Sequence, residues 1–75
     1  MIKIDWNEFK SYKQSHMDIS KKDNFLLLKE FITSYYNLSS YFDIYDMLRH
    51  DELSSMMLEK RNIDTPEALE RYFKR

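Results

Sequence analysis

The chain has 75 residues, with no glycine and no cysteine, and its 12 basic and 13 acidic residues leave a formal net charge of −1. This composition excludes a disulfide framework and a glycine-rich phosphate loop, and it lacks the basic excess typical of nucleic-acid-binding domains. With 43% hydrophobic and 16% aromatic residues, we expect one folded domain over residues 1–75.

The first predicted helix follows a capping box. Asp5 and Glu8 stand three residues apart, the spacing of such a box, so a helix is expected from residue 6 to about residue 16. Its apolar arc is the weakest in the chain because Lys13 interrupts it. His16 lies on this arc, where we expect a hydrogen-bonded boundary histidine rather than a catalytic group.

The second predicted helix is the central one. Ser20 and Asp23 fit another capping box, and the helix is expected over residues 21–36. At 100° per residue, seven side chains form an arc of about half the circumference, wide enough to touch several neighbours. The arc contains Phe25, Leu27, Leu28, Phe31, Ile32, Tyr35 and Tyr36. Leu26 falls outside it.

The third predicted helix follows the break at residues 37–40, with Ser40 and Asp43 as its capping box. Phe42 falls on the polar side of this helix, near Asp46 and Arg49. The inward stripe has the i, i+3, i+4, i+7 spacing of a buried helical face and contains Tyr41, Ile44, Tyr45 and Leu48.

Two further helices are predicted near the end of the chain. Asp51 fits the N-cap of a helix over residues 52–61, although a continuous helix through residues 41–61 is the alternative. Asn62 suits a left-handed C′ position, and residues 64–67 begin the last helix. The expected inward residues are Leu53, Met56 and Met57 in the fourth helix, with Leu58 off the stripe, and Leu69, Tyr72 and Phe73 in the last.

Together these patterns predict an all-α fold, a small bundle of four or five short helices. Residues 56–73, MMLEKRNIDTPEALERYF, resemble the helix–turn–helix segment near the start of the bacterial RecJ exonuclease family. Arg61-Asn62-Ile63 stands where that family has Arg-Gly-Ile, and Thr65-Pro66-Glu67 matches. The resemblance covers about a quarter of the chain and implies only helix–turn–helix geometry, because the catalytic DHH motifs are absent.

Catalytic and metal-binding chemistry has little support in the sequence. Asp46 and His50 are spaced i, i+4 with Asp43 one turn earlier, which can direct ligand atoms toward a divalent metal. Two or three ligands on a solvent-exposed face seldom complete a metal site, so a solvated polar face is the better explanation of these residues. We therefore expect no metal, no cofactor and no enzymatic activity.

A nucleic-acid-associated regulator is the alternative function. It would use basic residues of the last two predicted helices: Lys60, Arg61, Arg71, Lys74 and Arg75. Acidic residues are interleaved among them, and i, i+4 pairing such as Glu67 with Arg71 accounts for the charges without a ligand.

The preferred hypothesis is a non-enzymatic protein–protein interaction module. Apolar residues off the inward stripes or at their edges, with the charged residues around Phe42, define the predicted partner-binding set: Leu26, Tyr36, Phe42, Asp43, Asp46, Met47, Arg49 and Leu58. The abundance of Lys, Asn, Ile, Phe, Tyr and Met indicates AT-rich coding.

In size and style the chain is similar to small phage-encoded or mobile-element proteins that disable host replication, transcription or defence machinery. The expected partner is a host protein, and a homodimer is the second possibility. No apolar run approaches the length of a membrane span and no signal pattern is present, so a cytoplasmic location is expected, in the host cell if the chain is phage-encoded.

Overall fold

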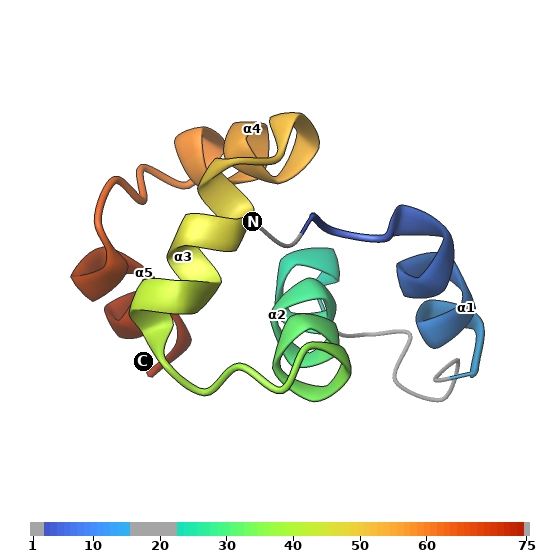
Figure 1. The fold of residues 1–75 in the computed structure, drawn as a ribbon. Coiled ribbons are helices and arrows are strands. Elements are labelled where there is room, and N and C mark those ends of the chain that lie inside the picture. Colours follow the sequence, from blue (N-terminus) through green and yellow to red (C-terminus); the bar gives the residue numbers. More distant parts are fainter. Residues whose placement is uncertain (1–2, 16–22, 75) are drawn as a thin grey trace.

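The computed structural model describes residues 3–15 and 23–74, and in this part of the chain it is all-α (Figure 1). Five short helices account for the regular structure, with no strand among the described residues. They are α1 Trp6–Ser15, α2 Asn24–Tyr35, α3 Tyr41–Arg49, α4 Glu52–Lys60 and α5 Pro66–Phe73. None of these helices has both the length and the hydropathy that crossing a membrane requires.

The helices form two groups that meet at α2. Figure 1 shows α2 between α1 and the group made by α3, α4 and α5, and α3 packs against α2, α4 and α5. The core lies where these helices converge. Its fully buried apolar side chains are Phe25, Leu28, Phe31, Ile32, Ile44, Leu48, Leu58 and Leu69.

Side-chain caps begin every helix near its predicted start. The Asp5 carboxylate accepts a hydrogen bond from the Glu8 N–H at the start of α1 (3.2 Å), and Thr65 Oγ1 caps α5. Asp23 itself caps α2, so the helix begins at Asn24, whereas the sequence predicted a start at about residue 21. Ser20, the cap that the sequence suggested, lies outside the described residues.

The N-terminal segment is fastened to the end of α2. Ile4 and Phe9 are both buried, at the two positions of a hydrophobic staple around the Asp5 cap. The capping box is completed by a different residue from the one expected, because the Asp5 N–H donates to the Tyr36 hydroxyl (2.8 Å) rather than to Glu8. The same hydroxyl donates to the Lys3 carbonyl (3.0 Å). Tyr36 therefore joins the segment before α1 to the end of α2.

A tight turn separates α3 from α4, which confirms the predicted break. The Asp51 carboxylate accepts from the Ser54 N–H (3.0 Å), and the buried Ser54 hydroxyl donates to the Leu48 carbonyl (2.6 Å). A small side chain at residue 54 lets the two helices approach closely, and its hydroxyl satisfies a carbonyl at the end of α3.

The turn after α4 is a Schellman motif. Asn62 has a φ of 57°, the left-handed conformation that the sequence predicted. The Ile63 N–H donates to the Leu58 carbonyl (3.0 Å) and the Asn62 N–H to the Glu59 carbonyl (3.1 Å). Ile63 and Leu58 are both buried, so the motif has its usual apolar contact and fixes the direction in which the chain enters α5.

The inward face of α4 is not the one that the apolar spacing predicted. Leu53 and Met56 are 57% and 60% exposed, whereas Ser54 and Leu58 are fully buried. The close α3–α4 turn places Ser54 against Leu48, and Leu58 follows one turn later on the same face. Tertiary packing therefore leaves the largest apolar stripe of α4 facing outward and buries the face that contains Ser54 and Leu58.

The aromatic residues of α2 and α3 are also less buried than predicted. Tyr35 is 52% exposed because it lies in the last turn of α2, where its ring stacks on Phe31 at a centroid distance of 5.0 Å. In α3, Ile44 and Leu48 are buried as expected, but Tyr41 and Tyr45 are only half-buried. The buried face includes Met47 instead, so the helix is rotated slightly from the predicted orientation.

Candidate functional site

Phe42 is the most exposed large apolar residue described on α3. Its side chain is 63% exposed in the first turn, on the face opposite the buried Ile44. Asp46 and Arg49 follow at i+4 and i+7, so they share this face, and both are exposed. The structure thus places Phe42 on the polar side of the helix, as the sequence predicted.

A hollow of about 370 Å³ lies beside Phe42, where the start of α3 meets α5. The side chains around it come from two segments far apart in the sequence, and they include Tyr41, Phe42, Pro66, Glu67, Glu70 and Lys74. We call this hollow, with the exposed Asp43 and Asp46, the acidic-aromatic surface. Sequence reasoning missed its α5 residues, because no local signal shows which helix lies beside the start of α3.

Two of the basic groups near this surface are engaged in ion pairs. Lys74 Nζ lies 2.7 Å from a Glu70 carboxylate oxygen, and this hydrogen bond raises the pKa of Lys74. The Arg49 guanidinium lies 4.0 Å from Glu59. Both pairs are exposed and contribute little to stability, but Lys74 offsets the charge of Glu70 beside the hollow. Asp43, Asp46 and Glu67 then give the surface an acidic character.

Other members of the predicted partner-binding set lie elsewhere. Met47 is 5% exposed and Leu58 is fully buried, so the expectation that they reach a partner from the surface is wrong. Both face the core because α3 and α4 are rotated from their predicted orientations. Leu26 and Tyr36 are half-buried, and the Tyr36 hydroxyl already bonds the backbone of residues 3 and 5.

The Asp46–His50 pair makes an internal contact. His50 Nδ1 lies 2.7 Å from the Asp46 backbone carbonyl rather than from its carboxylate, so this ring nitrogen caps the end of α3. Within residues 3–15 and 23–74, no cluster of three or more histidine and carboxylate side chains is arranged to hold a metal ion.

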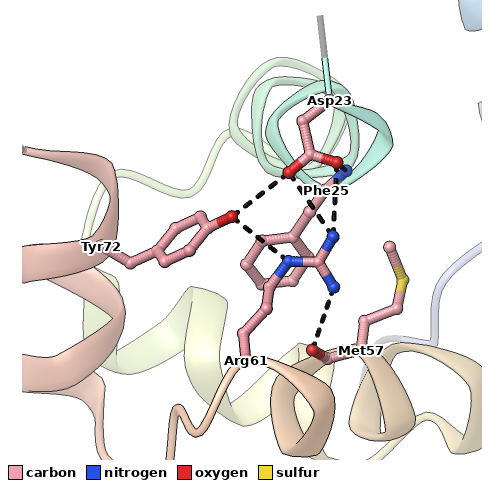
Figure 2. Close-up of polar contacts among 5 residues, drawn as sticks. All are labelled: Asp23, Phe25, Met57, Arg61 and Tyr72. Carbon is pink, nitrogen blue, oxygen red and sulfur yellow. Dashed lines mark hydrogen bonds and ion pairs between the residues drawn. The ribbon is translucent and has the colours of Figure 1, made fainter.

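Arg61 forms the most extensive polar contact in the described structure (Figure 2). Its Nη2 lies 3.3 Å from the Asp23 carboxylate, its Nε donates to the Tyr72 hydroxyl (3.3 Å), and its Nη1 donates to the Met57 carbonyl (3.2 Å). Figure 2 also shows the guanidinium against the Phe25 ring, with its carbon 4.6 Å from the centroid. One side chain therefore joins the start of α2, the end of α4 and α5.

This contact changes the interpretation of the basic residues near the end of the chain. Sequence reasoning placed Arg61 in a nucleic-acid-binding set, but its side chain is only 22% exposed and its donors are bonded internally. Lys74 is paired with Glu70, whereas Lys60 and Arg71 are exposed. Arg75 lies outside the described residues. The residue spacing gave no signal for the Arg61 contact, because Asp23 is 38 positions away.

Comparison with protein-family models, with curated proteins and with solved structures finds no match to this chain. Function has to be inferred from the surface of the molecule itself.

Proposed function

We propose that the chain is a small non-enzymatic protein–protein interaction module that binds a larger host protein through the acidic-aromatic surface. It would act as an inhibitor or regulator of the phage or mobile-element type, directed at replication, transcription or defence machinery. Its size, its AT-rich coding and the local chemistry of this surface support the proposal.

The exposure of Phe42 is the observation that carries the proposal. Burying a phenylalanine side chain stabilises a protein by about 1.5–3 kcal/mol. The helix has a well-formed core face at Ile44 and Leu48, yet Phe42 is 63% exposed. Folding therefore leaves this ring unused, and exposed aromatic rings beside a polar rim are typical of binding hot spots.

The charges around Phe42 favour a basic partner. Asp43 and Asp46 on α3 and Glu67 on α5 are exposed carboxylates, and Glu67 lines the same hollow as Phe42. A partner pocket that accepts an aromatic ring and has lysine or arginine at its rim would complement both features. Exposed charges at the rim of an interface speed association, and salt screens them. Less partner should therefore be captured as the salt concentration rises.

Affinity capture from a lysate of the host cells tests the proposal. The tagged chain is compared with Phe42→Ala and with Tyr35→Ala, a matched control that removes another half-exposed ring. We expect Phe42→Ala to reduce the captured partner by roughly tenfold or more, since truncating a hot spot costs about 2 kcal/mol or more. Tyr35→Ala should retain the partner.

Circular dichroism of the variants provides the necessary control. Equal helix content in Phe42→Ala and the parent chain means that any lost capture reflects the surface. Capture that survives in folded Phe42→Ala would contradict the proposal. Light scattering of the same samples distinguishes a host partner from a second copy, the homodimer that sequence analysis left open.

The nucleic-acid alternative has less support from the geometry. It relied on basic groups of α4 and α5, and two of these, Arg61 and Lys74, are engaged with Asp23 and Glu70. Binding to a DNA duplex at low salt, with a steep loss as salt rises, would restore this alternative.

A further inference from the structure

A second hollow lies on another part of the molecule, between α1 and α4 and beside the start of α2. Its volume is about 450 Å³, within the ~300–1,000 Å³ typical of ligand pockets. We call it the basic-apolar groove, and its main side chains are Trp6, Phe9, Lys10, Lys13, Leu53 and Met57. It shares no residue with the acidic-aromatic surface.

The apolar lining of the groove is held in place by internal contacts. Trp6 Nε1 donates to the Asp51 carboxylate (3.0 Å), and its ring meets Phe9 edge-on at a centroid distance of 5.7 Å. The polar atom of the indole is therefore satisfied, and the ring serves as an apolar wall. Such a preformed wall lowers the entropy lost on binding.

The α4 side of the groove presents apolar surface that the core uses only in part. Leu53 is 57% exposed and Met57 is half-buried, and they stand i, i+4 on one face of the helix. Met56, beside this face, is 60% exposed. A helix that turns its leucine and methionine toward a hollow, and its serine toward the core, is arranged to contact something outside the domain.

The α1 side of the groove is basic. Trp6, Lys10 and Lys13 follow the i, i+4, i+7 spacing and so form one stripe on α1. Lys13 Nζ lies 5.5 Å from the centre of the Phe9 ring, which places its positive charge over the groove's aromatic lining. Lysine stems can cover apolar surface while their ammonium groups stay in water.

We propose that the basic-apolar groove binds an acidic amphipathic helix from a partner protein. Large apolar side chains on one face of that helix would contact Trp6, Leu53 and Met57, and flanking carboxylates would meet Lys10 and Lys13. Helix-in-groove recognition uses apolar anchors at i, i+3, i+4 and i+7, and the lysine rim selects the sign of the charges beside them. This site goes beyond the proposed function, which concerns a different surface and a basic partner.

Trp6 provides the measurement, because it is the single tryptophan of the chain and lines the groove. Its fluorescence is followed while the full chain is titrated with a synthetic helical peptide that has leucine at the four anchor positions and glutamate on both flanks. A second peptide carries lysine in place of every glutamate. We expect saturable binding of the acidic peptide and at least about tenfold weaker binding of the basic one.

Matched variants locate the binding site. Lys10→Glu should weaken binding of the acidic peptide by about tenfold, whereas Arg71→Glu, the same charge change at an exposed residue of α5, should have little effect. Leu53→Ser should abolish saturable binding, while Met56→Ser, at an equally exposed residue outside the groove lining, should preserve it. Phe42→Ala should leave peptide binding unchanged, which separates this test from that of the proposed function.

Three results would overturn the inference. Equal affinity for the two peptides would show that the lysine rim selects nothing. If both Lys10→Glu and Leu53→Ser bind the acidic peptide as the parent chain does, the peptide-binding site lies outside the groove. A fluorescence change that follows protein concentration without peptide would show that a second copy, rather than an acidic helix, covers the groove.

Discussion

Phe42 and Leu53 are exposed to a similar extent, 63% and 57%, yet they belong to surfaces of opposite character. Phe42 lies on the polar face of α3, near exposed carboxylates. The hollow beside it is lined in part by the Glu70–Lys74 ion pair. Leu53 borders a hollow with an aromatic lining and lysines on its rim. The two surfaces therefore favour partners of opposite charge.

The difference also concerns how each surface is built. The central part of the acidic-aromatic surface is one helical face, so the periodicity of α3 alone was enough to identify it. The basic-apolar groove joins residues of α1 and α4 that are forty or more positions apart, and the hydrogen bond from Trp6 to Asp51, the N-cap of α4, fixes the two helices beside each other. A surface of this kind becomes visible only when the helices are placed relative to one another.

The largest expected effect tests which face of α4 is core. Leu58→Ala should lower the free energy of unfolding by about 2–5 kcal/mol, because it leaves a cavity at a fully buried position. Leu53→Ala should change it by no more than about 0.5 kcal/mol. Urea denaturation followed by circular dichroism measures both. The reverse order of effects would mean that Leu53 faces the core and that the groove is misassigned.

A smaller effect separates basic residues that stabilise the fold from those available to a partner. Arg61→Ala should lower the free energy of unfolding by about 1–2 kcal/mol. The substitution removes the hydrogen bonds that Arg61 donates to the Met57 carbonyl, the Asp23 carboxylate and the Tyr72 hydroxyl. Lys10→Ala, at an exposed residue of the groove rim, should have almost no effect on the same quantity. Equal losses would show that Arg61 behaves as an ordinary surface residue.

Local signals predicted most of the fold. Capping side chains gave the helix starts at Asp5, Ser40 and Asp51, the segment 64–67 gave the start of the last helix, and Asn62 gave the turn after α4. These signals involve neighbours within a few residues, where backbone geometry and sequence spacing determine each other. The all-α bundle follows from them directly.

The side of each helix that faces the core was harder to predict, because the rotation of a helix about its axis depends on contacts across the molecule. The apolar pattern of α4 favoured Leu53 and Met56 as inward residues, but the Ser54–Leu48 contact sets a different face. Arg61 likewise has the spacing of a surface charge, but it pairs with Asp23 at the N-cap of α2. The candidate site kept Phe42, Asp43, Asp46 and Arg49 on the surface and lost Met47 and Leu58 to the core for the same reason.

The free energy of unfolding of Phe42→Ala tests the central claim most directly, which is that this ring is left for a partner rather than used in the core. The exposed position predicts a change within about 0.5 kcal/mol of the parent chain. A loss of about 3–5 kcal/mol, the cost of truncating a core phenylalanine, would contradict the account.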